Sequence, residues 1–182
     1  MQDDIERILI PRQRIAERIR EMAGEISRTY GEEPDGGLTV VTILSGSIIF
    51  LADLMRQLPY RMKLGLITVS SYRGPTTQSQ GSRVLAEMNT DVAGRHVLII
   101  DDILDTGGTL RMVRQRLEET GPRSIRTCVL LRKPSKAPAD VPADYVGFDV
   151  DDVFVVGYGL DYNDLYRNLP DIGVLRKELY AS

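Results

Sequence analysis

Apolar and polar positions repeat along the chain with two different periods. Between residues 12 and 29, isoleucine and methionine recur every three or four positions among arginines and glutamates, which predicts an amphipathic helix with a solvated arginine face. Short apolar runs predict strands, the clearest of which would be buried on both faces of a sheet. These runs lie at 38–44, 64–69, 83–87, 97–100, 125–131, 145–150 and 154–158. A second helix is expected at 48–57, and a third from Leu110 to a stop signal at Gly121-Pro122.

Strands that alternate with helices predict an α/β fold, with a mainly parallel sheet flanked by helices on both faces. The composition agrees, because 182 residues with 42% hydrophobic and 27% charged side chains suit one globular domain over residues 1–182. Ligands of such sheets bind beyond the carboxyl ends of the strands. The segments to inspect are therefore 44–47, 101–109 and the stretch after 156.

Single histidine and cysteine residues restrict the chemistry. With only His96 and Cys128, the chain has no internal disulfide, no Cys/His zinc site and no dithiol pair. We expect His96 at a strand edge and Cys128 buried and inert in a strand. A formal charge of −3 argues against nucleic acid as a partner. Neither a secretory signal nor a membrane span is visible, so we expect a cytoplasmic protein away from membranes.

The most informative junction runs from Asp101 to Thr109, where a buried strand enters a Thr-Gly-Gly-Thr turn that opens a helix. Gly107 and Gly108 allow successive backbone amides to converge on an anion, and the helix N-terminus adds about half a positive charge. The spacing is neither that of a Walker loop nor that of a dinucleotide-binding loop. The turn therefore predicts a phosphate site of another kind.

Three carboxylates accompany this turn, namely Asp101, Asp102 and Asp105. Carboxylates repel phosphate, so they must serve another group, and a sugar diol or a divalent cation would suit them. Phosphate beside hydroxyl groups describes a phosphorylated ribose. The alternative interpretation is that Asp105 caps the helix and that the other two are solvated charges at the end of a strand.

Two longer motifs resemble a known family. Residues 97–110, Val-Leu-Ile-Ile-Asp-Asp-Ile-Leu-Asp-Thr-Gly-Gly-Thr-Leu, resemble the phosphoribosyl-pyrophosphate motif of type I phosphoribosyltransferases. Residues 154–163, with Arg167 after them, resemble the purine-side segment of the hypoxanthine-guanine phosphoribosyltransferases. Residues 131–135 resemble the loop that carries the purine-recognising lysine of that family, and Ser71-Tyr72 resembles the start of its mobile lid.

The resemblance implies the type I phosphoribosyltransferase fold, with a core at about 38–160 and a small hood formed by the N-terminal segment and residues 161–182. It implies an enzyme of purine salvage that transfers the 5-phosphoribosyl group from phosphoribosyl pyrophosphate to a 6-oxopurine. Hypoxanthine, guanine or both would be the base, with IMP or GMP and pyrophosphate as products. Mg2+ would be the cofactor, and the assembly would be a homodimer or homotetramer.

The resemblance also implies roles for individual residues. Asp105 would be the general base at purine N7, since a carboxylate within reach can accept the proton. Asp101 and Asp102 would hold the ribose hydroxyls and, together with Asp161, would be metal ligands. Lys133 would donate to the 6-oxo group and so disfavour adenine. The other substrate contacts would come from Leu44, Ser45, Gly46, Ser71, Tyr72, Thr106, Gly107, Gly108, Thr109, Phe154, Val155 and Arg167.

One segment departs from the family pattern. Where the family commonly has Leu-Lys-Gly with a non-proline cis peptide, this chain has Leu44-Ser45-Gly46 and lacks the lysine charge. Backbone amides before the helix at 48–57 could still bind pyrophosphate. We therefore predict that the cis bond between Leu44 and Ser45 is retained. The polar stretch 70–82 is predicted to be a lid.

Two other classes of protein compete with this interpretation. One is a regulator on the same fold that binds phosphoribosyl pyrophosphate or RNA without turnover. The other is a phospho-receiver domain, whose acidic pocket Leu-Ile-Ile-Asp-Asp resembles. The acidic chain argues against RNA, and the phosphate-type turn after the acidic pair argues against a receiver domain.

Overall fold

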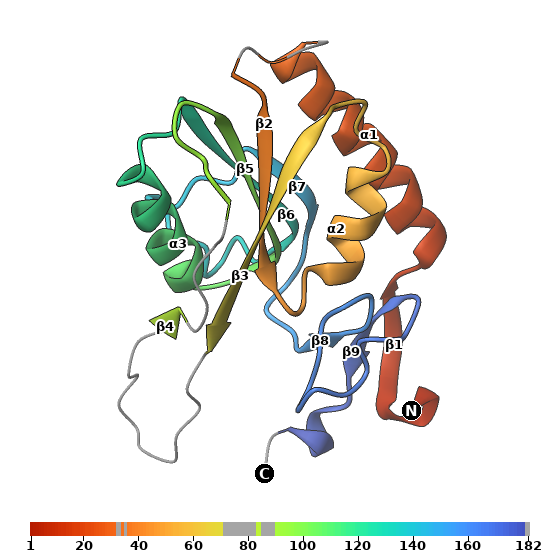
Figure 1. Ribbon diagram of the computed structural model, residues 1–182. Coiled ribbons are helices and arrows are strands. Elements are labelled where there is room, and N and C mark those ends of the chain that lie inside the picture. Colours follow the sequence, from red (N-terminus) through yellow and green to blue (C-terminus); the bar gives the residue numbers. More distant parts are fainter. Residues whose placement is uncertain (32–33, 35, 71–82, 85–89, 181–182) are drawn as a thin grey trace.

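A central sheet and a smaller terminal sheet make up the molecule (Figure 1). The computed structural model describes residues 1–31, 34, 36–70, 83–84 and 90–180. The helices are α1 (Arg12–Tyr30), α2 (Ile48–Met55) and α3 (Gly108–Glu118), with single 3-10 turns η1 (Gln2–Asp4) and η2 (Lys177–Leu179) near the ends. The strands are β1 (Ile5–Ile10), β2 (Leu38–Leu44), β3 (Met62–Ser70), β4 (Arg83–Val84), β5 (His96–Leu104), β6 (Ser124–Arg132), β7 (Tyr145–Asp149), β8 (Val155–Val156) and β9 (Ile172–Leu175).

The central sheet has the order β4-β3-β2-β5-β6-β7, and all neighbours except β3 and β4 are parallel. Helices α1 and α2 cover one face and α3 covers the other, as Figure 1 shows. Successive side chains of β5 point to opposite faces of the sheet. Leu98 packs in the hydrophobic cluster beneath α1 and α2, whereas Ile99 packs in the cluster beneath α3. The predicted α/β fold with strands buried on both faces is therefore confirmed.

Strand β5 extends four residues beyond the run that predicted it, because the ladder with β6 continues through Leu104↔Arg132. Asp101 and Asp102 consequently belong to the strand, and the turn begins only after Leu104. The other boundaries differ from prediction by a few residues, and α2 ends at Met55 rather than at residue 57. Of the expected strand at 83–87, only 83–84 lies within the described residues.

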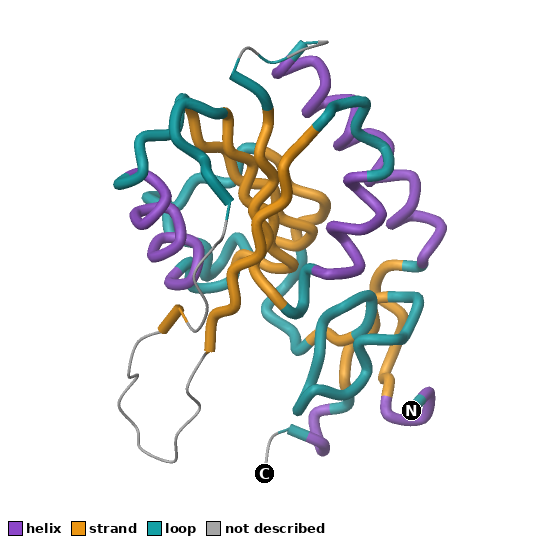
Figure 2. The backbone as a smooth tube through the Cα atoms, viewed as in Figure 1, coloured by secondary structure: helices purple, strands orange, loops and turns teal. Residues whose placement is uncertain are grey.

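The second sheet, with the order β1-β9-β8, is antiparallel and joins the two ends of the chain (Figure 2). Its strands β1 and β9 were not predicted, although a hood from the terminal segments was expected. The expected strand at 154–158 shortens to β8, because Gly157, Tyr158 and Gly159 all have positive φ angles and turn the chain away. This sheet lies beyond the carboxyl ends of β5 and β6 in Figure 1.

Helix α1 differs from its prediction in one respect. Arg18 does not belong to a solvated face, since its side chain is only 19% exposed. Its guanidinium donates to the carbonyl oxygens of Val146 and Gly147 on β7 at 2.8 and 3.0 Å, and to Glu25 at 2.7 Å. Strand β7 is an edge of the described sheet, and Arg18 provides hydrogen-bond donors to two of its consecutive carbonyl groups.

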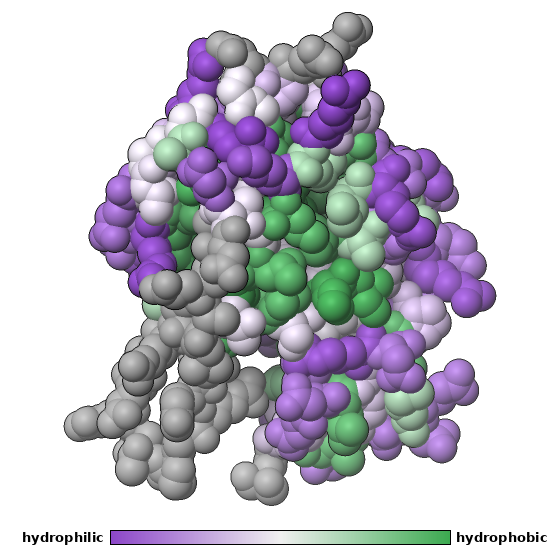
Figure 3. All heavy atoms as spheres, in the orientation of Figure 1, coloured by the Kyte–Doolittle hydropathy of each residue, from purple (hydrophilic) through white to green (hydrophobic). Residues whose placement is uncertain are grey.

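The face seen in Figure 3 is mainly polar toward its margin and has an apolar area across its centre. Exposed apolar side chains of the described residues include Ile48 on α2 and Leu64 and Leu66 on β3. No helix in the described part of the chain has both the length and the apolar character needed to cross a membrane.

Candidate active site

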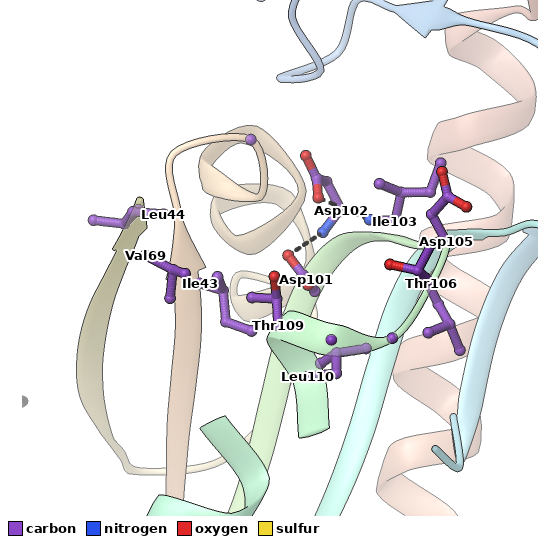
Figure 4. Close-up of a pocket in the computed structure, with 14 residues that line it drawn as sticks. Ile43, Leu44, Val69, Asp101, Asp102, Ile103, Asp105, Thr106, Thr109 and Leu110 are labelled. Atoms are coloured by element: carbon purple, nitrogen blue, oxygen red, sulfur yellow. Dashed lines mark hydrogen bonds between the residues drawn. The ribbon is translucent and has the colours of Figure 1, made fainter. Parts of the chain in front are cut away.

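Two adjoining pockets lie at the carboxyl ends of the central strands. The first has a volume of about 390 Å³ and lies between the ends of β2 and β5 and the turn before α3 (Figure 4). Its lining comprises Ile43, Leu44, Gly46, Val69 and the continuous segment Asp101–Leu110. The sequence placed Leu44, Gly46 and the phosphate-type turn here, and the structure brings them together.

The turn before α3 has the geometry of an anion site. Gly107 has a φ of +73°, and a side chain there would meet Pro138 at 2.9 Å, so glycine is required on both counts. Helix α3 begins at Gly108, and no described side chain caps it, which leaves its first amides available to a ligand. Thr106 and Thr109 line the same pocket. The arrangement can bind a phosphate through backbone amides and the helix N-terminus.

The buried Asp101 and the half-buried Asp102 form an acidic pair beside this turn. Burial raises the pKa of Asp101 well above its usual range, and the adjacent charge of Asp102 adds to the rise. Burial also raises the pKa of Asp102, although hydrogen bonds and the charge of Arg167 oppose it. The Asp102 amide donates to Asp101 Oδ1 at 3.0 Å, and the Ile103 amide donates to Asp102 Oδ1 at 2.8 Å (Figure 4). Hydrogen-bond donors such as sugar hydroxyls, or a bound cation, would stabilise the negative charge of this pair.

Glycine at position 46 makes room for the pair. A Cβ atom on Gly46 would overlap the carboxylate of Asp102. Gly159, which has a φ of +100°, packs against the carbonyl group of Gly46. A side chain on Gly159 would clash with that carbonyl oxygen. The peptide bond between Leu44 and Ser45 is cis, as predicted.

The second pocket, of about 520 Å³, shares Asp102, Ile103 and Asp105 with the first. The remaining lining residues are Lys133, Lys136, Asp152, Val153, Phe154, Val155, Leu160, Asp161 and Tyr180. The expected base-recognition residues Lys133, Phe154 and Val155 therefore meet in one place. A ligand that spans both pockets would pass directly over the Asp102–Asp105 boundary.

Two lysines and two carboxylates form a charge network in the second pocket. Lys133 Nζ lies 3.0 Å from Asp152 and 3.7 Å from Asp105. Lys136 Nζ lies 2.8 Å from Asp152 and 3.9 Å from Asp105. Asp105 Oδ1 is buried, and no described residue donates a hydrogen bond to it. The side chain as a whole is 37% exposed and lines both pockets, so the carboxylate of Asp105 is an acceptor that a ligand can reach.

Aromatic rings form the outer side of the second pocket. Phe154 stacks on Tyr180, with ring centroids 4.8 Å apart at 28°, and meets Tyr162 edge-on at 5.5 Å. The Tyr162 hydroxyl donates to the carbonyl of Leu179 and so fixes the C-terminal segment. Tyr180 was not predicted as a pocket residue, and neither were Lys136, Asp152 and Ile103. Ile103, Lys136 and Asp152 lie within or beside the sequence motifs, whereas no motif lies near Tyr180.

Several predicted residues lie elsewhere. Arg167 lines neither pocket; its guanidinium donates to the carbonyl of Gly159 at 2.9 Å and pairs with Asp161 and Asp164 at 2.8 Å. Ser45 is exposed and does not line the first pocket, although its neighbours do. Ser71 and Tyr72, with the rest of the predicted lid, lie outside the described residues.

The proposed metal ligands do not form a single cluster. Within the described ranges, no group of three or more acidic, histidine or cysteine side chains could hold a metal ion, so Asp161 does not join Asp101 and Asp102 in one protein site. Carboxylate oxygens still suit Mg2+, which is often held by one or two carboxylates together with substrate phosphates and water. The donor set fits a cation that arrives with a phosphorylated substrate.

The two residues assigned no catalytic role occupy structural positions. His96 is the first residue of β5, with Nδ1 2.7 Å from the Ser124 hydroxyl and its ring edge-on to Tyr30. Cys128 is fully buried in β6, where burial raises the pKa of its thiol. Both placements agree with expectation.

Comparison with known proteins identifies the family. Residues 7–163 match the model of the phosphoribosyl transferase domain. Hypoxanthine-guanine phosphoribosyltransferases from Bacillus subtilis (strain 168) and Mycobacterium avium are 40% and 41% identical, over 100% and 97% of this chain and 99% and 89% of theirs. A crystal structure of a hypoxanthine phosphoribosyltransferase from Staphylococcus aureus superposes with a TM-score of 0.91 at 37% identity, and the match covers 100% of this chain and 97% of that one. The chain thus belongs to the phosphoribosyl transferase family, among its hypoxanthine-guanine phosphoribosyltransferases.

Proposed function

We propose that the chain is an enzyme of purine salvage that transfers the 5-phosphoribosyl group of phosphoribosyl pyrophosphate to hypoxanthine, guanine or both. The observation that carries this proposal is the pair of pockets that share Asp102, Ile103 and Asp105. One pocket offers amides for a phosphate and carboxylates for hydroxyls, and the other offers a lysine and an aromatic ring for a base. The reacting sugar carbon would lie at their boundary.

Asp105 is the proposed proton acceptor. During transfer a purine ring nitrogen bonds to the anomeric carbon, the bond from that carbon to pyrophosphate breaks, and the base must lose a proton from N7. Asp105 lines the pocket in which the base would lie, and its carboxylate can accept that proton. Asp101 and Asp102 would hold the ribose hydroxyls, and their negative charge would favour the positive, oxocarbenium-like sugar.

Lys133 is the proposed reader of the 6-oxo group. Its side chain is only 9% exposed and its ammonium lies 3.7 Å from Asp105, so one base could contact both groups. An ammonium donates to an oxo group but meets a second donor in the amine of adenine. Phe154 would stack on the purine, and the backbone of Val155 would meet its 2-position.

Mg2+ belongs to the proposal as a partner of the substrate phosphates. Asp101 and Asp102 from β5 would hold it at the first pocket, and Asp161 from the hood, which does not form one cluster with them, would hold it at a separate position in the second. When bound, the ion neutralises phosphate charge and so favours departure of pyrophosphate. Ser45, through its backbone, and Arg167 would add contacts to pyrophosphate, and the segment that contains Ser71 and Tyr72 would cover it.

The assembly and the location are also part of the proposal. We expect a homodimer or homotetramer, in which exposed apolar side chains such as Ile48, Leu64 and Leu66 are candidates for the subunit contact. The cytoplasmic location expected from the sequence stays a proposal, and the family to which the chain belongs supports it.

A direct assay tests the function. Purified protein is incubated with phosphoribosyl pyrophosphate, Mg2+ and each of hypoxanthine, guanine, xanthine and adenine, and nucleotide formation is followed by chromatography. We expect IMP or GMP at catalytic turnover, little AMP, and loss of turnover with a chelator. Binding of phosphoribosyl pyrophosphate without turnover would instead indicate a regulator, and acceptance of a phosphoryl group at Asp101 or Asp102 would indicate a receiver domain.

A further inference from the structure

The buried ammonium of Lys133 lies between two carboxylates and is bound by only one of them. It donates to Asp152 Oδ1 at 3.0 Å, whereas its distance to Asp105 Oδ2 is 3.7 Å, beyond hydrogen-bonding range. Asp152 belongs to the segment that leads into β8, and its role follows from neither the sequence motifs nor the phosphate turn. The choice of partner therefore needs an explanation.

An ammonium bound directly to Asp105 would impair the proposed proton acceptor. A carboxylate in a close ion pair holds its charge more firmly and accepts a proton less readily. Such a pair would also draw Lys133 away from the 6-oxo edge of a base. In the structure Asp105 is not bound in this way, because Lys133 and Lys136 remain at 3.7 and 3.9 Å from its oxygens.

Asp152 is equipped to retain the ammonium. Hydrogen bonds from Lys136 and then from Lys133 hold the pKa of its carboxyl below the usual range, so it stays negative. Lys136 approaches it at 2.8 Å, and the same contact raises the pKa of Lys136. The carboxylate thus binds one lysine from the protein side and one at the rim of the pocket, since Lys136 is 41% exposed.

We propose that Asp152 is a positioning residue, which holds the ammonium of Lys133 away from Asp105 and directs it to the 6-oxo group of the base. The inference rests on the proposed function, because it assigns Asp105 and Lys133 their roles. The other charged side chains that line the second pocket with Asp105 and Asp152 are Lys133 and Lys136 from the loop after β6, Asp102 from β5, and Asp161 after β8. When Asp152 loses its charge, Asp105 becomes the nearest anion to both lysines.

The test compares Asp152→Asn with Asp152→Glu and with Asp151→Asn. Asp151 is the adjacent carboxylate, lies outside both pockets and borders a separate hollow near Phe148. For Asp152→Asn we expect kcat with hypoxanthine to fall about tenfold, with the KM for phosphoribosyl pyrophosphate unchanged. The acid limb of the kcat profile should move to lower pH, because both lysines then act on Asp105. Asp152→Glu should keep the acid limb in place, and Asp151→Asn should match the wild type.

A second comparison separates positioning from general damage to the fold. In an Asp105→Asn background, adding Asp152→Asn should change kcat little, because the residue acts through Asp105. A further loss of similar size in that background, or an acid limb that stays in place in Asp152→Asn, would overturn the inference. If Asp152→Asn does not fold, Asp152→Glu decides, and a shifted acid limb in that variant also counts against it. An inactive wild type would instead reject the proposed function itself.

Discussion

The two pockets are built in different ways. Ten of the fourteen residues around the first pocket form the unbroken segment Asp101–Leu110, and much of what they offer is backbone. The second pocket collects side chains from five separate segments, the last of which is Tyr180 near the C-terminus. A site for the part of a substrate that never varies can be made from one local motif, whereas a site that discriminates among bases needs side chains from distant parts of the chain.

Their electrostatics differ as well. The described lining of the first pocket contains no lysine to balance the acidic pair, and burial raises the pKa of Asp101 and Asp102. In the second, two lysines balance two carboxylates within 4 Å. The acidic pair of the first pocket thus depends on its ligands to offset its charge, whereas in the second pocket Asp105 and Asp152 already have lysine partners before a base arrives. Changes at the boundary, in one pocket, or in the other should therefore have distinct effects.

The largest effect is expected at the boundary. Asp105→Asn should lower kcat about a hundredfold, because the amide cannot accept the proton from N7. Binding of phosphoribosyl pyrophosphate, measured by calorimetry, should change by less than about threefold, since the carboxylate is not its main contact. Near-normal turnover would remove Asp105 from the role of base.

The next effect should be confined to the first pocket. Gly46→Ala should weaken phosphoribosyl-pyrophosphate binding by at least about tenfold, because the added methyl group would overlap the Asp102 carboxylate. Gly24→Ala is the matched control: its Cβ would meet only Arg28 at 3.6 Å, and the change in α1 should stabilise the fold by about 1 kcal/mol. If Gly46→Ala binds normally, the first pocket adapts more than its packing indicates.

A change in the second pocket should alter selectivity rather than binding of the sugar. Lys133→Ala should reduce the preference for hypoxanthine over adenine about tenfold, the value of one charged hydrogen bond. The KM for phosphoribosyl pyrophosphate should stay near that of the wild type. Lys63→Ala, an exposed lysine on β3, serves as the control. Unchanged kinetics across the bases would mean that another group reads the 6-oxo edge.

The smallest effect should appear in stability. The folded pKa of Asp101 lies above the unfolded value of about 3.9. The folded chain therefore retains a proton that the unfolded chain releases, and the carboxyl destabilises the fold as pH rises from the unfolded to the folded pKa. Asp101→Asn should raise the free energy of unfolding at pH 7 by about 1 kcal/mol. The gain should disappear toward pH 3, as measured by urea unfolding, whereas Asp151→Asn should show no such trend.

The sequence predicted the local pocket better than the assembled one. Residues 101–109 are contiguous, so their order alone indicated amides and carboxylates around a phosphorylated sugar. Lys136, Asp152 and Tyr180 were missed because only the folded chain brings them to Lys133 and Phe154. Their types and spacing carry no signal without that proximity.

The same reason applies to the fold. Each long, apolar strand of the central sheet was predicted, since its burial is visible as a run of apolar residues. Strands β1 and β9 were missed because each gains its partner only from the opposite end of the chain, as in the pairing of Ile5 with Leu175. Arg18 was misassigned for a related reason, since carbonyls of β7 far along the sequence bind its guanidinium.

The pairing of β1 with β9 also bears on how the protein is made. Ribosomes add about 5–20 residues each second, so β1 emerges on the order of ten seconds before the strand that completes its sheet. Throughout that interval residues Ile5–Ile10 have no β9 to pair with, and the stacked rings of Phe154 and Tyr180 have not yet met. The sugar-phosphate pocket can form on the nascent chain, but the base pocket becomes complete only once Tyr180 has been added.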